Sequence, residues 1–183
     1  MPDFEIHTVD SAPEGSRRLL RGLNDQIGFI PNLAATMAEA PALLEAFVTL
    51  QTIGHRTSLS PIERQVIAVA VATETGCTYC VAAHSTFALK SGAQPGAVDA
   101  VRAGSPLGDA RLDALARFAR AVVRREADAR QRAEELLRAG LSQVQILETL
   151  VAIAVPLMAG SAFQLTAVKL DGAFQPQAWA HTA

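Results

Sequence analysis

The 183-residue sequence contains little cysteine, few aromatic residues and no marked excess of either charge. Two cysteines are too few for a fold held together by a network of disulfides. Hydrophobic residues make up 50% of the chain but aromatic residues only 5%, so Ala, Val, Leu and Ile side chains must form most of the core. Such side chains favour closely packed helices. We therefore expect a single all-α domain over residues 1–183.

The charge pattern excludes several classes of partner. The net charge is −2 at pH 7, and no run of Lys and Arg is long enough to follow a nucleic-acid backbone. Residues 1–16 are acidic and interrupted by Pro and Gly, which is not typical of a secretory signal. No apolar run approaches the roughly 20 residues that a membrane span requires. The sequence predicts a cytoplasmic protein that binds neither nucleic acid nor membrane.

Hydrophobic spacing predicts a series of helices after an extended arm at residues 1–14. The first helix is closed by Gly28 and Pro31, and the second has Pro41 in its first turn and ends at Gly54. The next begins with a capping box, in which Ser60 is followed by Glu63, and stops at Gly76. Further helices are expected over residues 77–90, 95–104, 109–140 with a break near Ala127, and 141–170.

The segment 141–170 repeats features of the segment that begins at residue 59. Ser142 and Gln145 form a second capping box, and VAIAV at 151–155 resembles IAVAV at 67–71. This similarity suggests two related helical halves, of which only the first carries cysteines. Pro156 should kink or end the second of these helices. The tail 171–183 holds the only Trp and is expected to dock on the rest of the protein.

Both cysteines lie in the stretch ETGCTYCVAAHS at residues 74–85. After the stop at Gly76, Cys77 is placed at or next to a helix N-cap and Cys80 in the first turn, where the helix dipole lowers a thiol pKa. Cys77, Cys80 and His84 follow an i, i+3, i+7 pattern and share one helical face, so the imidazole can take up the thiol proton. This pattern indicates redox chemistry, in which a sulfenic acid condenses to a disulfide that an external thiol reduces.

Other interpretations of the motif remain open. Cys-x-x-Cys-x-x-x-His could hold zinc with a fourth ligand from elsewhere, or the cysteines could be structural. The other histidines, His7, His55 and His181, are isolated and lack ligand spacing, so no metal is expected. His55 is expected at a helix end or on the surface. Tyr79, between the cysteines, is expected to line the pocket.

Residues 59–93, LSPIERQVIAVAVATETGCTYCVAAHSTFALKSGA, resemble the core motif of the alkylhydroperoxidase D and carboxymuconolactone decarboxylase family, in its peroxidase-related branch. Residues 28–47 resemble the upstream helix pair, and the resemblance covers residues 28 to about 93. It implies an all-helical bundle that forms homo-oligomers, either trimers or hexamers. It also implies a peroxidase that acts on organic hydroperoxides or hydrogen peroxide.

By this resemblance Cys80 would be the peroxidatic cysteine, Cys77 the resolving cysteine and His84 a proton relay. The peroxidases of the family carry a glutamate where this sequence has Gln65, and an amide cannot accept and pass on a proton as a carboxylate does. Glu63 faces a different side of the predicted helix from Gln65, and it is already used in the predicted capping box. Glu74 is near Cys77 in sequence and could act in the relay, although its position also suits an exposed residue at a helix end.

These observations predict a thiol-dependent peroxidase that uses a dithiol reductant, for example one of the lipoyl type, and needs no cofactor. A redox-switched binding or assembly module without turnover is one alternative, suggested by Gln65. A decarboxylase-like enzyme that acts on a ring lactone is another, and it fits less well because that branch does not need a cysteine pair. We also expect a homo-oligomer, because the helices around residues 66–72 and 149–155 are apolar over broad arcs.

Overall fold

Residues 4–180 are the part of the chain that this computed structural model describes, and they contain helices and no strand. The predicted all-α fold is therefore confirmed. The elements are α1 (Glu14–Ile27), α2 (Asn32–Met37), α3 (Pro41–His55), α4 (Pro61–Glu74), α5 (Thr78–Lys90), α6 (Pro95–Ala103), α7 (Ala110–Arg124), α8 (Ala129–Arg138), α9 (Gln143–Thr166) and the 3₁₀ helix η1 (Gly172–Gln177).

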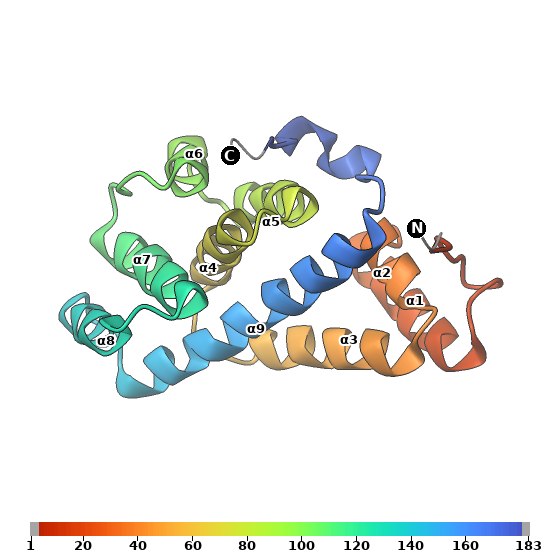
Figure 1. Cartoon of the computed structure of the whole chain (residues 1–183), viewed down its shortest axis with the longest axis horizontal. Helices are drawn as coiled ribbons and strands as arrows, with labels where there is room; N and C mark the ends of the chain where they lie inside the picture. Colours follow the sequence, from red (N-terminus) through yellow and green to blue (C-terminus); the bar gives the residue numbers. More distant parts are fainter. Residues whose placement is uncertain (1–3, 181–183) are drawn as a thin grey trace.

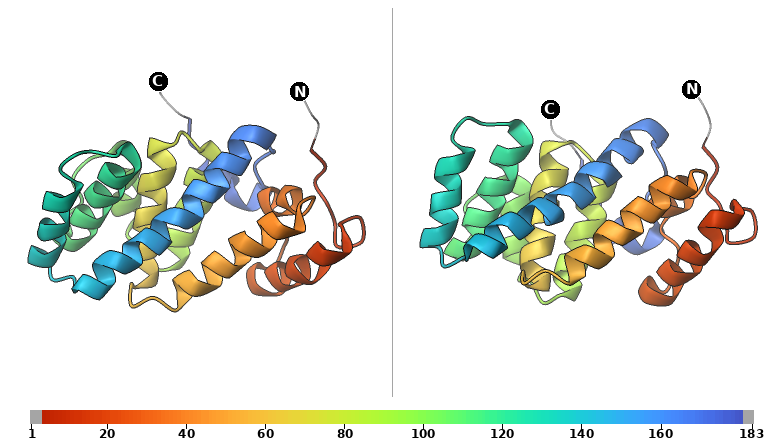
Figure 2. Two further views of the ribbon diagram at one scale, coloured as in Figure 1. Left: turned by 60° about the horizontal axis from the view of Figure 1, so that its bottom comes forward. Right: turned by 90° about the horizontal axis from the view of Figure 1, so that it is seen from below.

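The long helix α9 crosses the middle of the molecule. It packs against α3 and α4, and it also contacts α8 near its start and α2 near its end (Figures 1 and 2). Two clusters of buried side chains meet along it. One cluster lies among α4, α6, α7 and α8, and the other among α1, α2, α3, α5 and η1. The second cluster contains both cysteines, so the motif is built into the core.

The helix ends largely follow the sequence signals. The Ser60 hydroxyl accepts a hydrogen bond from the Glu63 N–H at 3.2 Å, and the Glu63 carboxylate accepts one from the Ser60 N–H at 2.6 Å. Ser142 and Gln145 form the second predicted capping box. Gly28 ends α1 with a φ of 92°, which favours glycine. The break predicted near Ala127 separates α7 from α8.

Three sequence predictions differ from the structure. Hydrophobic spacing does not predict α2, since its six residues lie between two prolines and show no clear period, although the family resemblance implies a helix pair over residues 28–47. Helix α3 continues through Gly54 to His55. Pro156 does not end its helix, because α9 runs on to Thr166. A proline inside a helix costs about 3 kcal/mol, and here Pro156 is buried in a helix that packs against neighbours along its length.

The similarity between the two halves does not extend to a repeated pair of helices. In the first half α4 ends at Glu74 and the chain turns into α5, whereas α9 is a single uninterrupted helix. The two similar apolar stretches lie in α4 and α9, which pack against each other. The similarity therefore reflects two core helices with the same apolar character.

Helix α9 also corrects the expectation about apolar runs. Among residues 4–180 it is long and apolar enough to cross a membrane, by length and composition only. Its single charged residue is Glu148, near its start. A core helix of a soluble protein meets the same two criteria, and α9 packs against α2, α3, α4, α5 and α8. These contacts bury one side of α9, whereas Val144, Leu147 and Leu165 on it stay exposed.

The residues after α9 dock on the protein, as expected for the tail up to residue 180. The ring of Phe174 in η1 is 1% exposed and lies 5.6 Å from Phe29, 5.9 Å from Tyr79 and 5.5 Å from Phe87, measured between ring centroids. Phe174 therefore fixes η1 against α5, close to the cysteine motif. Residues 181–183 and the predicted isolated histidine His181 lie outside the described residues.

Phe174→Ala should lower the free energy of unfolding by about 3–5 kcal/mol, because it removes a buried ring and leaves a cavity. Urea denaturation followed by circular dichroism measures this change. Phe4→Ala is a suitable control, since Phe4 is 38% exposed and its loss should change stability by no more than about 0.5 kcal/mol. Equal effects of the two substitutions would contradict the proposed docking of η1.

Candidate functional site

A three-residue connection between α4 and α5 positions the cysteines. Thr75 caps α4, and its hydroxyl donates to the Val71 carbonyl at 3.0 Å. Gly76 has a φ of 65°, a left-handed conformation that side chains disfavour. The Cys77 N–H then donates to the Ala72 carbonyl at 3.0 Å. These contacts reverse the chain so that α5 begins directly after Cys77.

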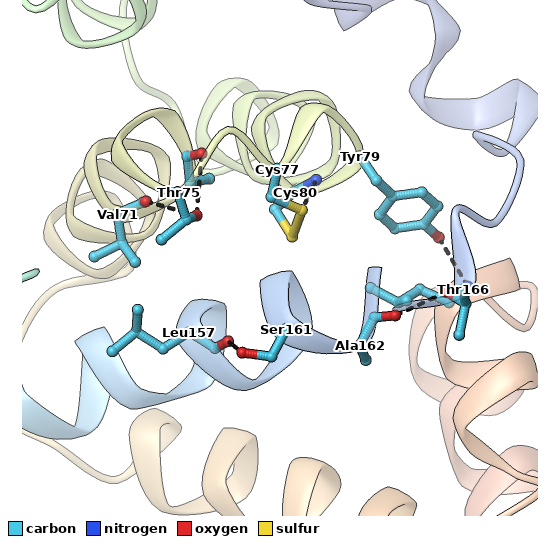
Figure 3. Close-up of a disulfide and its surroundings, with 11 residues drawn as sticks. Val71, Thr75, Cys77, Tyr79, Cys80, Leu157, Ser161, Ala162 and Thr166 are labelled. Atoms are coloured by element: carbon cyan, nitrogen blue, oxygen red, sulfur yellow. Dashed lines mark hydrogen bonds between the residues drawn. A yellow bond between two sulfur atoms is a disulfide. The ribbon is translucent and has the colours of Figure 1, made fainter. Parts of the chain in front are cut away.

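Cys77 is the N-cap residue of α5, as predicted. Its sulfur accepts a hydrogen bond from the Cys80 N–H at 3.1 Å, in place of the oxygen that usually caps a helix. Cys77 and Cys80 form a disulfide, with 5.2 Å between their Cα atoms, and each residue is 2% exposed. Figure 3 shows the two sulfur atoms on the side of α5 that faces α9. The pair can therefore exist as a disulfide without leaving the core.

Helix α9 approaches the cysteine connection closely at Gly160. A Cβ atom at this position would lie 3.4 Å from the Thr75 hydroxyl oxygen and 3.6 Å from the Cys77 Cβ. A small residue therefore lets α9 pack directly on the turn that holds Cys77. Ala159, next to Gly160, borders the same cavity as Cys80, so α9 packs beside both cysteines at this point.

His84 lies one turn after Cys80 and contacts Gln65 of α4. Its Nδ1 is 2.9 Å from the Gln65 side-chain oxygen. In this amide orientation Nδ1 carries the proton and donates it, which leaves Nε2 as the acceptor. Burial lowers the His84 pKa to about 4, because desolvation disfavours the imidazolium. At neutral pH His84 is uncharged and able to accept a proton.

A small apolar cavity of about 60 Å³ borders both Cys80 and His84. Cys80 lines it, whereas Cys77 does not. Tyr79 also lines it, as predicted. The other lining residues are mostly apolar, with only Gln51 adding a polar side chain: Leu23, Ile27, Pro31, Leu33, Ala34, Phe47, Ala83, Phe87, Ala159 and Phe174. A molecule entering this cavity would therefore meet the sulfur of Cys80 first. We call this space the thiol cavity.

A hydrogen bond from Tyr79 connects the cysteine motif to the segment after α9. Its hydroxyl donates to the Asp171 carboxylate and accepts a hydrogen bond from the Leu33 N–H at 3.3 Å. The Asn32 N–H also donates to Asp171, with distances of 3.1 and 3.2 Å to the two oxygens. Burial and the neighbouring carboxylate raise the Tyr79 pKa, so the phenol stays protonated. These hydrogen bonds hold the Tyr79 side chain in place in the lining of the thiol cavity.

The structure does not bring the predicted glutamates to the cysteines. Glu74 forms ion pairs with Arg120 at 3.1 Å and Arg124 at 2.6 Å, on α7. Glu63 serves the cap and pairs with Arg111. Hydrogen bonds from that guanidinium and from Ser60 lower the Glu63 pKa although burial opposes them. Among the candidates for the relay, Gln65 alone contacts His84 in residues 4–180.

The remaining histidines have separate surroundings. His7 lies 2.6 Å from the Glu39 carboxylate and 3.2 Å from the Ser11 hydroxyl, far along the chain from the motif. His55 is exposed at the end of α3, as predicted. No group of three or more His, Cys, Asp or Glu side chains that could hold a metal ion occurs within residues 4–180.

The sequence did not identify two residues that shape the site. Asp171 reaches Tyr79 across 92 positions of the chain, and Gln51 of α3 borders the thiol cavity beside His84. Asp171 precedes Gly172 and the apolar Phe174, and this pattern by itself indicates only a tail that docks on the rest of the protein. Nothing local in the sequence marks Gln51.

Comparisons with known proteins agree with this geometry. Residues 41–121 match the model of the carboxymuconolactone decarboxylase family. This match begins later than the resemblance noted in the sequence and extends further, into α7. No curated protein matches the sequence significantly.

Several solved structures share the fold over nearly the whole chain. An alkylhydroperoxidase AhpD core protein from Ralstonia eutropha JMP134, described as peroxidase-related, is 21% identical with a TM-score of 0.82, and 95% of each chain is covered. A peroxidase-related protein from Silicibacter sp. TM1040 is 22% identical with a TM-score of 0.81, over 96% of this chain and 94% of that one. A cysteine-to-alanine variant of the debrominase Bmp8, in complex with 2,3,4-tribromopyrrole, is 20% identical with a TM-score of 0.81, over 97% and 95%.

The matched segment runs from α3 to α7 and contains the turn, both cysteines, Gln65 and His84. The structural similarity adds the flanking helices and the tail. The chain thus has the AhpD-like fold, and its residues 41–121 match the carboxymuconolactone decarboxylase family.

Proposed function

We propose that the protein is a thiol-dependent peroxidase that reduces hydroperoxides through a cycle between the Cys77–Cys80 dithiol and its disulfide. The single observation that carries this proposal is the position of Cys80, which forms the disulfide with Cys77 and lines a cavity together with His84. The peroxidase-related neighbours support the same chemistry. No cofactor is required, because the two sulfurs supply both electrons.

The oxidising half of the cycle would begin at Cys80. Neutral His84 accepts the thiol proton, and the thiolate attacks the terminal oxygen of the hydroperoxide. The O–O bond breaks, the alcohol leaves with a proton, and Cys80 becomes a sulfenic acid. The sulfur of Cys77 then attacks Cys80, water leaves, and the disulfide forms. Two electrons have passed from the thiols to the peroxide.

The reducing half would use Cys77 as the leaving group. A dithiol that enters the thiol cavity attacks the Cys80 sulfur, and the Cys77 sulfur departs as a thiolate. The Cys80 N–H already points at this sulfur from a distance of 3.1 Å, and the start of α5 favours a negative charge there. A stabilised thiolate leaves faster in thiol–disulfide exchange. The second thiol of the reductant then completes the exchange. A cytoplasmic location, where thiols are kept reduced, suits this step.

A second candidate function is reductive removal of halogen from an aromatic ring. The thiol cavity contains the rings of Phe47, Tyr79, Phe87 and Phe174, which suit a flat substrate, and one structural neighbour is a debrominase. In this reaction the Cys80 thiolate would attack bromine and the ring carbon would take up a proton. Cys77 would then displace bromide to form the same disulfide. Both candidate reactions depend on Cys80.

Cys80→Ser should reduce peroxide-dependent consumption of a dithiol to the uncatalysed background, because serine cannot replace the attacking sulfur. The assay follows oxidation of dihydrolipoamide with either hydrogen peroxide or 2,3,4-tribromopyrrole as the oxidant. Turnover with peroxide alone supports the peroxidase, and turnover with the bromopyrrole alone supports the second candidate.

Cys77→Ser is the matched control for this experiment. It should leave a sulfenic acid on Cys80 that dimedone traps and mass spectrometry locates. Full turnover by Cys80→Ser, or trapping of the sulfenic acid on Cys77 in Cys80→Ser, would reverse the assigned roles.

Gln65→Glu should raise the His84 pKa above its value of about 4 and increase the peroxidase rate at neutral pH. A carboxylate 2.9 Å from Nδ1 would stabilise the imidazolium, make His84 a stronger base and allow a proton to pass on. A gain of about tenfold or more in kcat with hydrogen peroxide is expected, since general base catalysis contributes roughly 10²–10⁴-fold. Nuclear magnetic resonance titration of His84 gives the pKa directly.

Gln65→Met separates the effect of charge from that of the lost hydrogen bond. It has a similar length but no carboxylate, so it should not raise the His84 pKa or the rate. A redox-switched binding module without turnover would show stoichiometric oxidation in every variant. That result would contradict the proposed enzyme and favour the non-catalytic alternative.

We also propose that the protein forms homo-oligomers through α9. Leu147 and Leu165 are 68% and 74% exposed and lie five helical turns apart on one face, and Val144 beside them is 63% exposed. Light scattering should give a multiple of the 19.3 kDa chain mass. Joint replacement of Leu147→Glu and Leu165→Glu should dissociate the oligomer, whereas Leu137→Glu on α8 should not. A monomeric parent protein would refute this proposal.

A further inference from the structure

A second, larger cavity opens beside His84. It has a volume of about 360 Å³ and lies where the ends of α1, α3 and α5 meet the start of α4. It shares Ile27, Gln51, His84 and Phe87 with the thiol cavity. The two spaces are therefore neighbours, and His84 stands between them. We call the larger cavity the vestibule.

The vestibule is lined by basic side chains and by no acidic one. Arg64 and Lys90 border it together with His55, and Asp and Glu do not occur among its lining residues. Within residues 4–180 neither Arg64 nor Lys90 forms an ion pair. Arg64 donates a hydrogen bond to the Leu59 carbonyl, which leaves its positive charge without a carboxylate partner.

The electrostatics of the neighbouring groups agree with an uncompensated positive charge. Burial lowers the Arg64 pKa, and the nearby Glu63, which raises it, is already paired with Arg111. Burial lowers the His55 pKa and the charge of Arg64 lowers it further. Gln65 also lines the vestibule, and its neutral amide adds no negative charge there. A bound anion would relieve this repulsion.

The positions of these groups set the shape of a ligand. Lys90 is ten residues after Cys80 on α5, which is about 15 Å along the helix axis. A molecule that reaches from the vestibule to Cys80 would have an anionic end near Arg64 and Lys90. Its other end would be apolar, because the thiol cavity is lined mainly by Leu, Ile, Ala and Phe side chains. Such a molecule is an amphipathic acid.

We propose that the vestibule binds the carboxylate of an amphipathic organic acid, and that the oxidant of Cys80 is the hydroperoxide of such an acid. This inference rests on the proposed peroxidase function and adds its substrate class. The chemistry at Cys80 is unchanged: the O–O bond breaks and a hydroxy acid leaves. Arg64 and Lys90 hold the carboxylate and contribute to binding rather than to the chemical step.

Direct binding tests the vestibule without any turnover. Calorimetric titration of the oxidised protein should show octanoate binding at least about tenfold more tightly than 1-octanol, because a hydrogen bond to a charged group is worth about 1.5–3 kcal/mol. Arg64→Gln and Lys90→Gln should each weaken octanoate binding by roughly three- to tenfold and leave 1-octanol unchanged. Arg64→Lys keeps the charge and should retain most of the affinity. Arg18→Gln, an exposed arginine outside the cavity, is the matched control.

Kinetics then identify which reactant carries the carboxylate. With an acidic hydroperoxide, such as that of linoleic acid, Lys90→Gln should raise KM with little change in kcat, and cumene hydroperoxide should be unaffected. If KM rises instead for dihydrolipoate but not for dithiothreitol, the vestibule holds the reductant and the proposed oxidant class is wrong.

Two outcomes separate this inference from the proposed function. Octanoate that does not bind, or binds equally to all variants, overturns the vestibule proposal even if peroxide is turned over. Charge-dependent octanoate binding without hydroperoxide turnover supports the vestibule and rejects the peroxidase.

Discussion

The three-residue connection between α4 and α5 is the constraint on which the rest of the site depends. Gly76 allows the sharp turn, and Cys77 then takes the N-cap position, where its sulfur replaces a capping oxygen. Cys80, one turn later, and His84, two turns later, line the thiol cavity. Because Gly160 lets α9 pack onto this turn, the cysteines are held in the core rather than on a mobile loop. The proposed sulfur chemistry would therefore take place on a rigid support.

Cys77 and Cys80 have different surroundings. The Cys80 N–H donates a hydrogen bond to the sulfur of Cys77, whereas Cys80 lines the thiol cavity together with His84. The proposed dithiol–disulfide cycle needs a leaving sulfur whose negative charge is stabilised. It also needs an attacking sulfur that the substrate can reach. Gln65 adds a further distinction, since it orients His84 without giving it a negative partner. Gln65 also lines the vestibule and adds no negative charge to it.

Much of the local structure could be predicted because its causes lie close together in the sequence. Ser60 with Glu63, the stop at Gly76 and the cap at Cys77 each depend on residues within a few positions. The hydrogen bond between Gln65 and His84 joins two helices, and no local signal in the sequence marks it. In contrast, the bond from Tyr79 to Asp171 joins residues 92 positions apart, and the vestibule exists only where four helix ends meet. At Pro156 the local sequence predicts a helix end, but α9 continues because it packs against its neighbours.

The central claim is that the start of α5 holds Cys80 as the accessible and reactive sulfur. Alkylation of the fully reduced protein with iodoacetamide over a range of pH, with the labelled residue located by mass spectrometry, tests it most directly. Cys80 should be alkylated first, and the pH midpoint of its alkylation should lie below the pKa of about 8.5 of a free cysteine. Labelling that begins at Cys77, or a midpoint at or above that of a free thiol, would contradict it.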